Sequence, residues 1–325
     1  MAYRAWHPDS EQRRPAQRSL LRRGGAARRT AAVLPTLLTL GNGLSGFMAI
    51  FLASRPADAP LPFNWTPLTF AALFIFLGMI FDGLDGMAAR LTRSTSDLGG
   101  QLDSMSDMVT FGVAPAFLAV QLVLVPSSLT PFFATTSADN YFGRFVLVVA
   151  MIYVACTALR LARFNVETKS AEITDHLSFK GLPSPGAAGT VASMVLLHEH
   201  YLVSHVRRLA AQGMPLGPDA PMSWSLFLTA MGMVAVMLLA AMAMVSRLRY
   251  IHVTNRYMRG RRPFRSIVAL VVCLLLVSTF PQQAVAGVFV LYALSAPCVW
   301  LWHVLTGRRR RGLAQAATDH RRANL

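Results

Sequence analysis

The residues of this sequence best suited to chemistry are four aspartates at a fixed spacing. Asp82 and Asp85 are three residues apart, and Asp103 and Asp107 are four apart, so each pair lies on one face of a helix. The cluster stands between two long apolar runs, and one acidic side chain at mid-bilayer costs roughly 2.5–3.5 kcal/mol. We therefore expect the four carboxylates to converge on a wet cavity, a cation, or both.

A cluster of carboxylates indicates hard divalent cations. The carboxylates repel one another at short range, and bound cations remove that repulsion. Oxygen ligands favour Mg²⁺ or Mn²⁺ over zinc, and four carboxylates suit two ions about 3.5–4 Å apart, a geometry used for in-line displacement at phosphorus. Small residues beside the acids leave room for a nucleotide or a pyrophosphate, and close helix packing in lipid explains them equally well. They are Gly83, Gly86, Ala89, Gly99 and Gly100.

The composition is that of a membrane protein. Of the 325 residues, 54% are hydrophobic and only 14% are charged, whereas a soluble domain carries about 25% charged residues. The net charge of +16 would fit nucleic-acid binding in a soluble protein. Here the arginines mostly flank apolar runs and no basic patch is interleaved with aromatic residues, so we expect no nucleic-acid partner. The three cysteines form no CxxC pair, which predicts neither disulfides nor a thiolate metal site.

Apolar stretches of about 20 residues predict an all-α, polytopic membrane protein. Eight such stretches occur, at 33–53, 66–84, 108–126, 143–160, 184–203, 223–245, 266–282 and 286–305. Eight spans place both termini on one side of the membrane, and 27 of the 31 Lys and Arg residues fall on that side. The positive-inside rule therefore predicts that the termini and the aspartates face the cytoplasm, in the cell's inner (cytoplasmic) membrane.

The remaining segments predict ordinary membrane-protein features. We expect a basic cytoplasmic tail at 1–32, a membrane core at 33–245, a basic loop and C-terminal membrane hairpin at 246–307, and a second basic tail at 308–325. Three nearby histidines, His198, His200 and His205, resemble a zinc-ligand group in type. They fall on the far side of the membrane from the aspartates, and we expect them to be interfacial or solvated.

The spacing of the acids resembles the signature of the CDP-alcohol phosphatidyltransferase family. The run Asp82-x2-Asp85-Gly86-x2-Ala89-Arg90-x8-Gly99-x3-Asp103-x3-Asp107 matches that signature at every fixed position. The resemblance implies six core membrane helices and a two-metal enzyme that displaces CMP from a CDP-linked lipid with an alcohol. It also implies that relatives form homodimers.

Residue roles follow from the same resemblance. It implies that Asp82, Asp85, Asp103 and Asp107 bind two Mg²⁺ or Mn²⁺ ions, and that Asp107 is also the catalytic general base toward the alcohol. It further implies contacts to the CDP-lipid, which we assign to Gly86, Arg90, Ser96, Thr39 and Asn42.

Three further segments narrow the choice of alcohol. The stretches 158–165, 179–189 and 34–43 resemble those of membrane-integral phosphatidylserine synthases, which implies CDP-diacylglycerol and L-serine as substrates. Arg160 and Arg163 lie on one helix face, where a guanidinium fork can hold a carboxylate, and Lys180 can hold a phosphate. Topology alone also places arginines at span ends.

Two alternatives stay open. The same chemistry can use another acceptor, namely glycerol 3-phosphate, inositol phosphate or choline. Acidic residues inside membrane spans also build cation pathways, so a cation transporter is the alternative from another class. A non-catalytic scaffold leaves the costly acids without an explanation.

Overall fold

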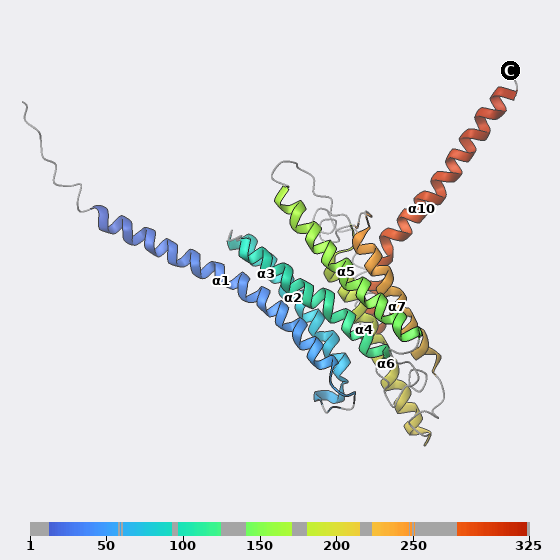
Figure 1. Ribbon diagram of the computed structural model, residues 1–325, viewed down its shortest axis with the longest axis horizontal. Coiled ribbons are helices and arrows are strands. Elements are labelled where there is room, and N and C mark those ends of the chain that lie inside the picture. Colours follow the sequence, from blue (N-terminus) through green and yellow to red (C-terminus); the bar gives the residue numbers. More distant parts are fainter. Residues whose placement is uncertain are drawn as a thin grey trace, which may run out of the picture.

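Every secondary-structure element in the part that the structure describes is a helix, as predicted. The computed structural model describes residues 13–57, 59, 61–92, 97–124, 141–170, 181–214, 223–246, 248, 250 and 278–323. In chain order the helical elements are α1 (Arg13–Ala53), η2 (Pro62–Asn64), α2 (Pro67–Thr92), α3 (Asp97–Asp107), η3 (Met108–Val113), α4 (Ala114–Leu124), α5 (Tyr141–Ser170), α6 (Ser184–Ala211), α7 (Trp224–Val245) and α10 (Pro281–Ala323). They form a bundle from which the ends of α1 and α10 project (Figure 1).

Six helices within the described residues are long and apolar enough to cross a membrane. They are Val33–Ala53, Pro67–Ala89, Leu98–Val123, Tyr141–Val166, Trp224–Val245 and Pro281–Thr306. Each coincides with a predicted span, although the third begins ten residues earlier than expected and so contains both Asp103 and Asp107. The protein is therefore a polytopic membrane protein.

Two predicted spans and the two predicted tails differ from these six helices. The span at 184–203 forms α6, whose polar residues keep it below the hydropathy of the other six. The span at 266–282 lies almost entirely outside the described residues. Residues 13–32 of the predicted N-terminal tail continue α1, and α10 continues through the second tail to Ala323.

Small residues bring α1 against the helices that carry the aspartates. A Cβ added to Gly46 would overlap Thr110 of η3, and one added to Gly78 of α2 would also overlap Thr110. The Thr110 hydroxyl donates a 2.8 Å hydrogen bond to the backbone carbonyl of Asn42. Such close approach in lipid depends on the missing side chains, and it fixes α1 beside both acidic helices.

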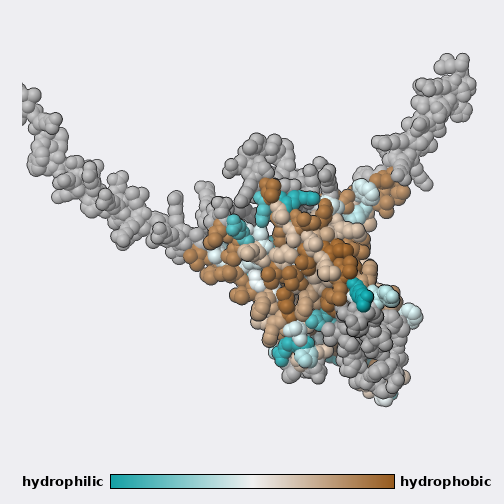
Figure 2. Space-filling view, viewed as in Figure 1, coloured by the Kyte–Doolittle hydropathy of each residue, from teal (hydrophilic) through white to brown (hydrophobic). Residues whose placement is uncertain are grey.

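The surface of the bundle has the distribution expected of a bilayer protein. Large hydrophobic side chains are exposed along one face of α1 (Leu40, Leu44, Phe47 and Phe51), and others lie along α5 and α10. Figure 2 shows a hydrophobic middle, with hydrophilic residues gathered toward the two ends of the bundle. The apolar side chains therefore meet lipid where a soluble protein would present charge.

The structure corrects the expectation for the histidines of α6. His198 is 2% exposed, and His205 is also buried, so neither is solvated. His198 Nδ1 lies 2.8 Å from the Thr229 hydroxyl of α7. Because α6 continues to Ala211, these histidines lie within the helix and pack inside the bundle.

Candidate active site

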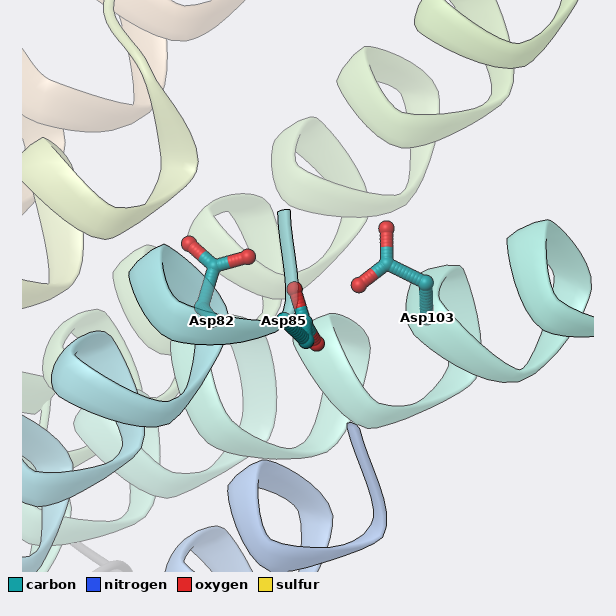
Figure 3. A group of neighbouring side chains, drawn as sticks. All are labelled: Asp82, Asp85 and Asp103. Atoms are coloured by element: carbon teal, nitrogen blue, oxygen red, sulfur yellow. The ribbon is translucent and has the colours of Figure 1, made fainter. Parts of the chain in front are cut away.

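Three of the four aspartates converge where α2 meets α3. A carboxylate oxygen of each of Asp82, Asp85 and Asp103 lies within 4.8 Å of the other two. Figure 3 shows the carboxylates of Asp82 and Asp103 facing the same space, with Asp85 between them. The three-residue spacing places Asp82 and Asp85 on one face of α2, and antiparallel return of the chain brings Asp103 opposite them.

The fourth aspartate lies one turn beyond Asp103, at the last residue of α3. Asp107 is 8% exposed and interacts electrostatically with the other three acids. Its Oδ1 accepts a 2.9 Å hydrogen bond from Nδ2 of Asn42. Directly after Asp107 the helix widens into the π-turn η3, a feature that is frequent at functional sites.

Two residues predicted to contact the CDP-lipid hold aspartates in this structure, and their contact with the lipid stays a prediction. Thr39 Oγ1 donates a 2.9 Å hydrogen bond to Asp85 Oδ2, and Asn42 holds Asp107. Both side chains are buried, Asn42 completely. Their hydrogen bonds restrict the orientation of two carboxylates, which is how residues behind a metal site position its ligands.

The space beside the acids is open. A Cβ added to Gly83, Gly86 or Gly100 would have no described atom within 4 Å. Tight helix packing therefore does not explain these three glycines, in contrast to Gly46 and Gly78. Of the two readings that the sequence allowed, room for a ligand fits them better.

The acids also fit divalent cations. Asp103 Oδ1 is buried and has no hydrogen-bond partner among the described residues, so one oxygen is desolvated without compensation. An all-carboxylate donor set suits Mg²⁺ or Mn²⁺. Asp82, Asp85 and Asp103 are placed to hold such an ion.

Arg160 faces the acids from α5. Its Nη1 donates a 2.7 Å hydrogen bond to the Ser184 hydroxyl at the start of α6, while its Nε is buried without a partner among the described residues. It interacts electrostatically with Asp107 and Asp82. The guanidinium therefore retains an unused donor on the border of the acidic cluster.

Arg163 is placed differently, although it lies only three residues further along α5. Its Nη1 approaches the backbone carbonyl of Val245, at the end of α7, at 3.5 Å. Nearby, Asn165 Nδ2 donates a 2.9 Å hydrogen bond to the Ser104 hydroxyl of α3. Arg163 and Asn165 thus connect α5 to its neighbours, and only Arg160 is turned to the acids.

Three of the predicted site residues cannot be placed in full. Arg90 belongs to α2, but its side chain lies outside the described part of the structure. Ser96 and Lys180 lie outside the described residues altogether. Their assignment to the CDP-lipid and to the acceptor stays a prediction.

The structure adds one residue that the sequence did not point to. Tyr292 of α10 interacts electrostatically with Arg160, and a Cβ added to Gly186 would lie 3.0 Å from its Cε1. Its ring also packs against Tyr250, with centroids 5.8 Å apart. No spacing in the sequence relates a tyrosine of the last helix to an arginine 132 positions earlier.

Comparisons with known proteins agree with the geometry. A relative in Helicobacter pylori is 34% identical over 179 residues, covering 54% of this chain and 64% of its own length. One in Bacillus subtilis is 36% identical over 154 residues, covering 47% of this chain and 70% of its own length. One in Saccharomyces cerevisiae is 36% identical over 161 residues, covering 48% of this chain and 51% of its own length. All three are named CDP-diacylglycerol–serine O-phosphatidyltransferase. The chain thus matches less than two thirds of the Helicobacter relative.

The family assignment rests on a larger match. The family model described as CDP-alcohol phosphatidyltransferase matches residues 32–218, which include the whole acidic cluster, Arg160 and all of α6. Helices α7 and α10 lie beyond the matched residues. The chain belongs to the CDP-alcohol phosphatidyltransferase family.

Proposed function

We propose that this protein transfers the phosphatidyl group of CDP-diacylglycerol to L-serine, giving phosphatidylserine and CMP. The observation that carries the proposal is the convergence of Asp82, Asp85 and Asp103 within 4.8 Å, inside the residues that match the family. The names of the relatives support serine as the acceptor, as does the position of Arg160 beside the acids.

Divalent cations belong to this proposal because the acids fit them. Such ions, when bound, would supply positive charge to the pyrophosphate and the departing CMP in an in-line displacement at phosphorus. The aspartates would hold them, and Thr39 fixes the carboxylate of Asp85 by its 2.9 Å hydrogen bond. The open space at Gly83, Gly86 and Gly100 admits the diphosphate.

The chain's own groups carry the proton transfer. Asp107 takes the proton of the serine hydroxyl, whose oxygen then bonds to the phosphatidyl phosphorus as the bond from that phosphorus to the CMP oxygen breaks. Asn42 occupies Oδ1 of Asp107, which leaves Oδ2 to accept the proton. The Nε of Arg160, which has no partner among the described residues, is available to the serine carboxylate. Arg163 and Lys180 are secondary candidates for the acceptor or a phosphate.

The membrane side and the assembly complete the proposal. We place the termini and the site on the cytoplasmic side of the inner membrane, because 27 of the 31 Lys and Arg residues fall there in the predicted topology. We also propose a homodimer, as the family resemblance implies. Light scattering of the purified protein, and labelling of single cysteines from either side of sealed vesicles, test these two points.

The decisive experiment measures CMP release by the purified full chain. The protein is supplied with CDP-diacylglycerol, Mg²⁺ or Mn²⁺, and one acceptor at a time: L-serine, glycerol 3-phosphate, inositol phosphate or choline. We expect release with serine alone. Release with another acceptor and none with serine would keep the chemistry and reject the serine assignment.

A further inference from the structure

A cavity lies at the end of the bundle remote from the aspartates. It has a volume of about 440 Å³ and is lined by η2 and the residues after it, the first turns of α2, the second half of α6 and the start of α10. Thr69 precedes Asp82 by 13 residues on α2, and Glu199 follows Ser184 by 15 residues on α6. At 1.5 Å per residue, both helices separate the cavity from the acidic cluster by roughly 20 Å.

A buried acid forms part of the wall of this cavity. Glu199 is 4% exposed, lines the cavity, and accepts a side-chain hydrogen bond from Thr66. A hydroxyl partner only partly offsets the cost of burying a carboxylate, and a cationic group offsets it much better. The proposed transferase reaction, far away along α6, makes no use of this acid.

A cation lines the same cavity further along α6. Arg207 is exposed and lies eight residues after Glu199, about 12 Å along the axis. Both side chains tilt toward the N-terminus of α6, and the long Arg207 side chain lies on the wall of the same cavity as Glu199. The cavity therefore offers a negative and a positive group, about two helix turns apart along α6, to one ligand.

The remaining wall is mainly apolar and aromatic, and its polar members are Thr66, Thr69, His200, Ser204 and Gln282. Phe63 and Trp65 pack against each other with ring centroids 5.6 Å apart, and the aliphatic side chains include Leu73, Leu196 and Val203. Trp is enriched where lipid meets water, and an aromatic face attracts an ammonium group. Such a wall suits the glycerol and upper acyl chain of a lipid better than a water-soluble solute.

We propose that this cavity binds a zwitterionic phospholipid that carries a primary ammonium group. The ammonium donates to Glu199 beside the Trp65 ring, the phosphate pairs with Arg207, and the glycerol and acyl carbons lie along the apolar wall. An anionic headgroup without an amine leaves Glu199 uncompensated. A trimethylammonium headgroup supplies charge but has no N–H to donate.

The test measures lipid binding to the purified full chain in detergent. Dihexanoyl phosphatidylethanolamine is titrated against phosphatidylcholine and phosphatidylglycerol of the same chain length, and against soluble phosphoethanolamine. Native mass spectrometry and the thermal unfolding midpoint report binding. We expect phosphatidylethanolamine to bind at least about tenfold more tightly than the other three, since a charge-assisted hydrogen bond contributes at least that factor.

Matched variants locate the binding in this cavity. Glu199→Gln and Arg207→Gln each weaken phosphatidylethanolamine binding about tenfold, whereas Arg208→Gln leaves it unchanged. Arg208 is also exposed, bonds the Ser204 carbonyl and does not line the cavity. Because Arg207 is exposed, we expect Arg207→Gln to fold, so this variant tests the proposal even if Glu199→Gln does not fold. Equal affinity for phosphatidylcholine or phosphoethanolamine, or full affinity in both variants, overturns the proposal.

Discussion

The two ends of the bundle both bury acids, but they surround them differently. At one end four aspartates lie beside small residues and open space, and Asp103 Oδ1 has no hydrogen-bond partner among the described residues. At the other end a glutamate bonds a threonine in a cavity that an arginine and mainly apolar side chains also line. Several converging carboxylates indicate inorganic divalent cations. One carboxylate beside aromatic rings indicates an organic ammonium, so the neighbours of a buried acid identify what balances its charge.

Removal of divalent cations gives the largest expected difference between the two ends. Chelation with EDTA should abolish CMP release, because the diphosphate and the four carboxylates would repel one another without the ions. Readdition of Mg²⁺ or Mn²⁺ should restore it, while lipid binding in the Glu199 cavity stays unchanged throughout. CMP release that survives exhaustive chelation would remove the metal from the proposed mechanism.

Neutralising one acid at each end separates their roles. Asp107→Asn should lower turnover about 10²-fold or more, because an amide cannot take the serine proton, while CDP-diacylglycerol still binds. Glu199→Gln should keep the wild-type rate of CMP release. A CMP assay measures the turnover, and a lipid-nucleotide titration measures the binding of CDP-diacylglycerol. Comparable losses of turnover in the two variants would show that the two ends are not independent.

Two buried threonines allow a subtler comparison. Thr39→Val removes the hydrogen bond to Asp85 and should lower turnover about 10- to 100-fold, as loss of a residue behind a metal ligand does. Thr229→Val removes the contact to His198 at the other end and serves as the control. Steady-state CMP release in Mg²⁺ measures both, and equal rates for the two variants would contradict a positioning role for Thr39.

Two glycines distinguish packing from room for a ligand. A Cβ on Gly46 overlaps Thr110, so Gly46→Ala should lower the free energy of unfolding by about 1–3 kcal/mol. A Cβ on Gly86 meets no described atom, so Gly86→Ala should leave the stability unchanged and raise only the KM for CDP-diacylglycerol. Thermal unfolding in detergent measures the first effect. A destabilised Gly86→Ala variant would mean that this space is filled.

The smallest expected effect concerns the helix beyond the family match. Tyr292→Phe should raise the KM for serine about three- to fivefold, the size of one neutral hydrogen bond, because Tyr292 lies beside Arg160. Tyr250→Phe is the control, since the Tyr250 hydroxyl bonds the backbone of Ala293. The KM for CDP-diacylglycerol should not change in either variant. An unchanged KM for serine in Tyr292→Phe would leave α10 without a part in acceptor binding.

The sequence predicted the parts of the molecule that depend on local pattern. Apolar length identified six of the eight predicted spans among the described residues. The spacing of Asp82, Asp85 and Asp103 predicted their convergence, because helical periodicity and a short connection leave few other arrangements. The small residues beside the acids were also visible in the sequence. The sequence did not show that Gly86 faces open space whereas Gly46 and Gly78 pack against Thr110.

Contacts between distant segments could not be predicted in this way. Thr39 and Asn42 were expected to contact the lipid nucleotide, and only the packing of α1 shows them bonded to Asp85 and Asp107. The burial of His198 depends on α7, and the approach of Tyr292 to Arg160 depends on α10. Such pairs are set by how helices dock, which periodicity within one helix does not encode.

The π-turn at Met108–Val113 makes the third membrane helix sensitive to length. A π-turn accommodates an additional residue within an otherwise regular helix, and each residue of an α-helix rotates the chain by about 100°. Deletion of Val109 would let this segment wind as an ordinary helix, and the widened turn directly after Asp107 would be lost. Evolution can exchange residues in this segment more easily than it can shorten it.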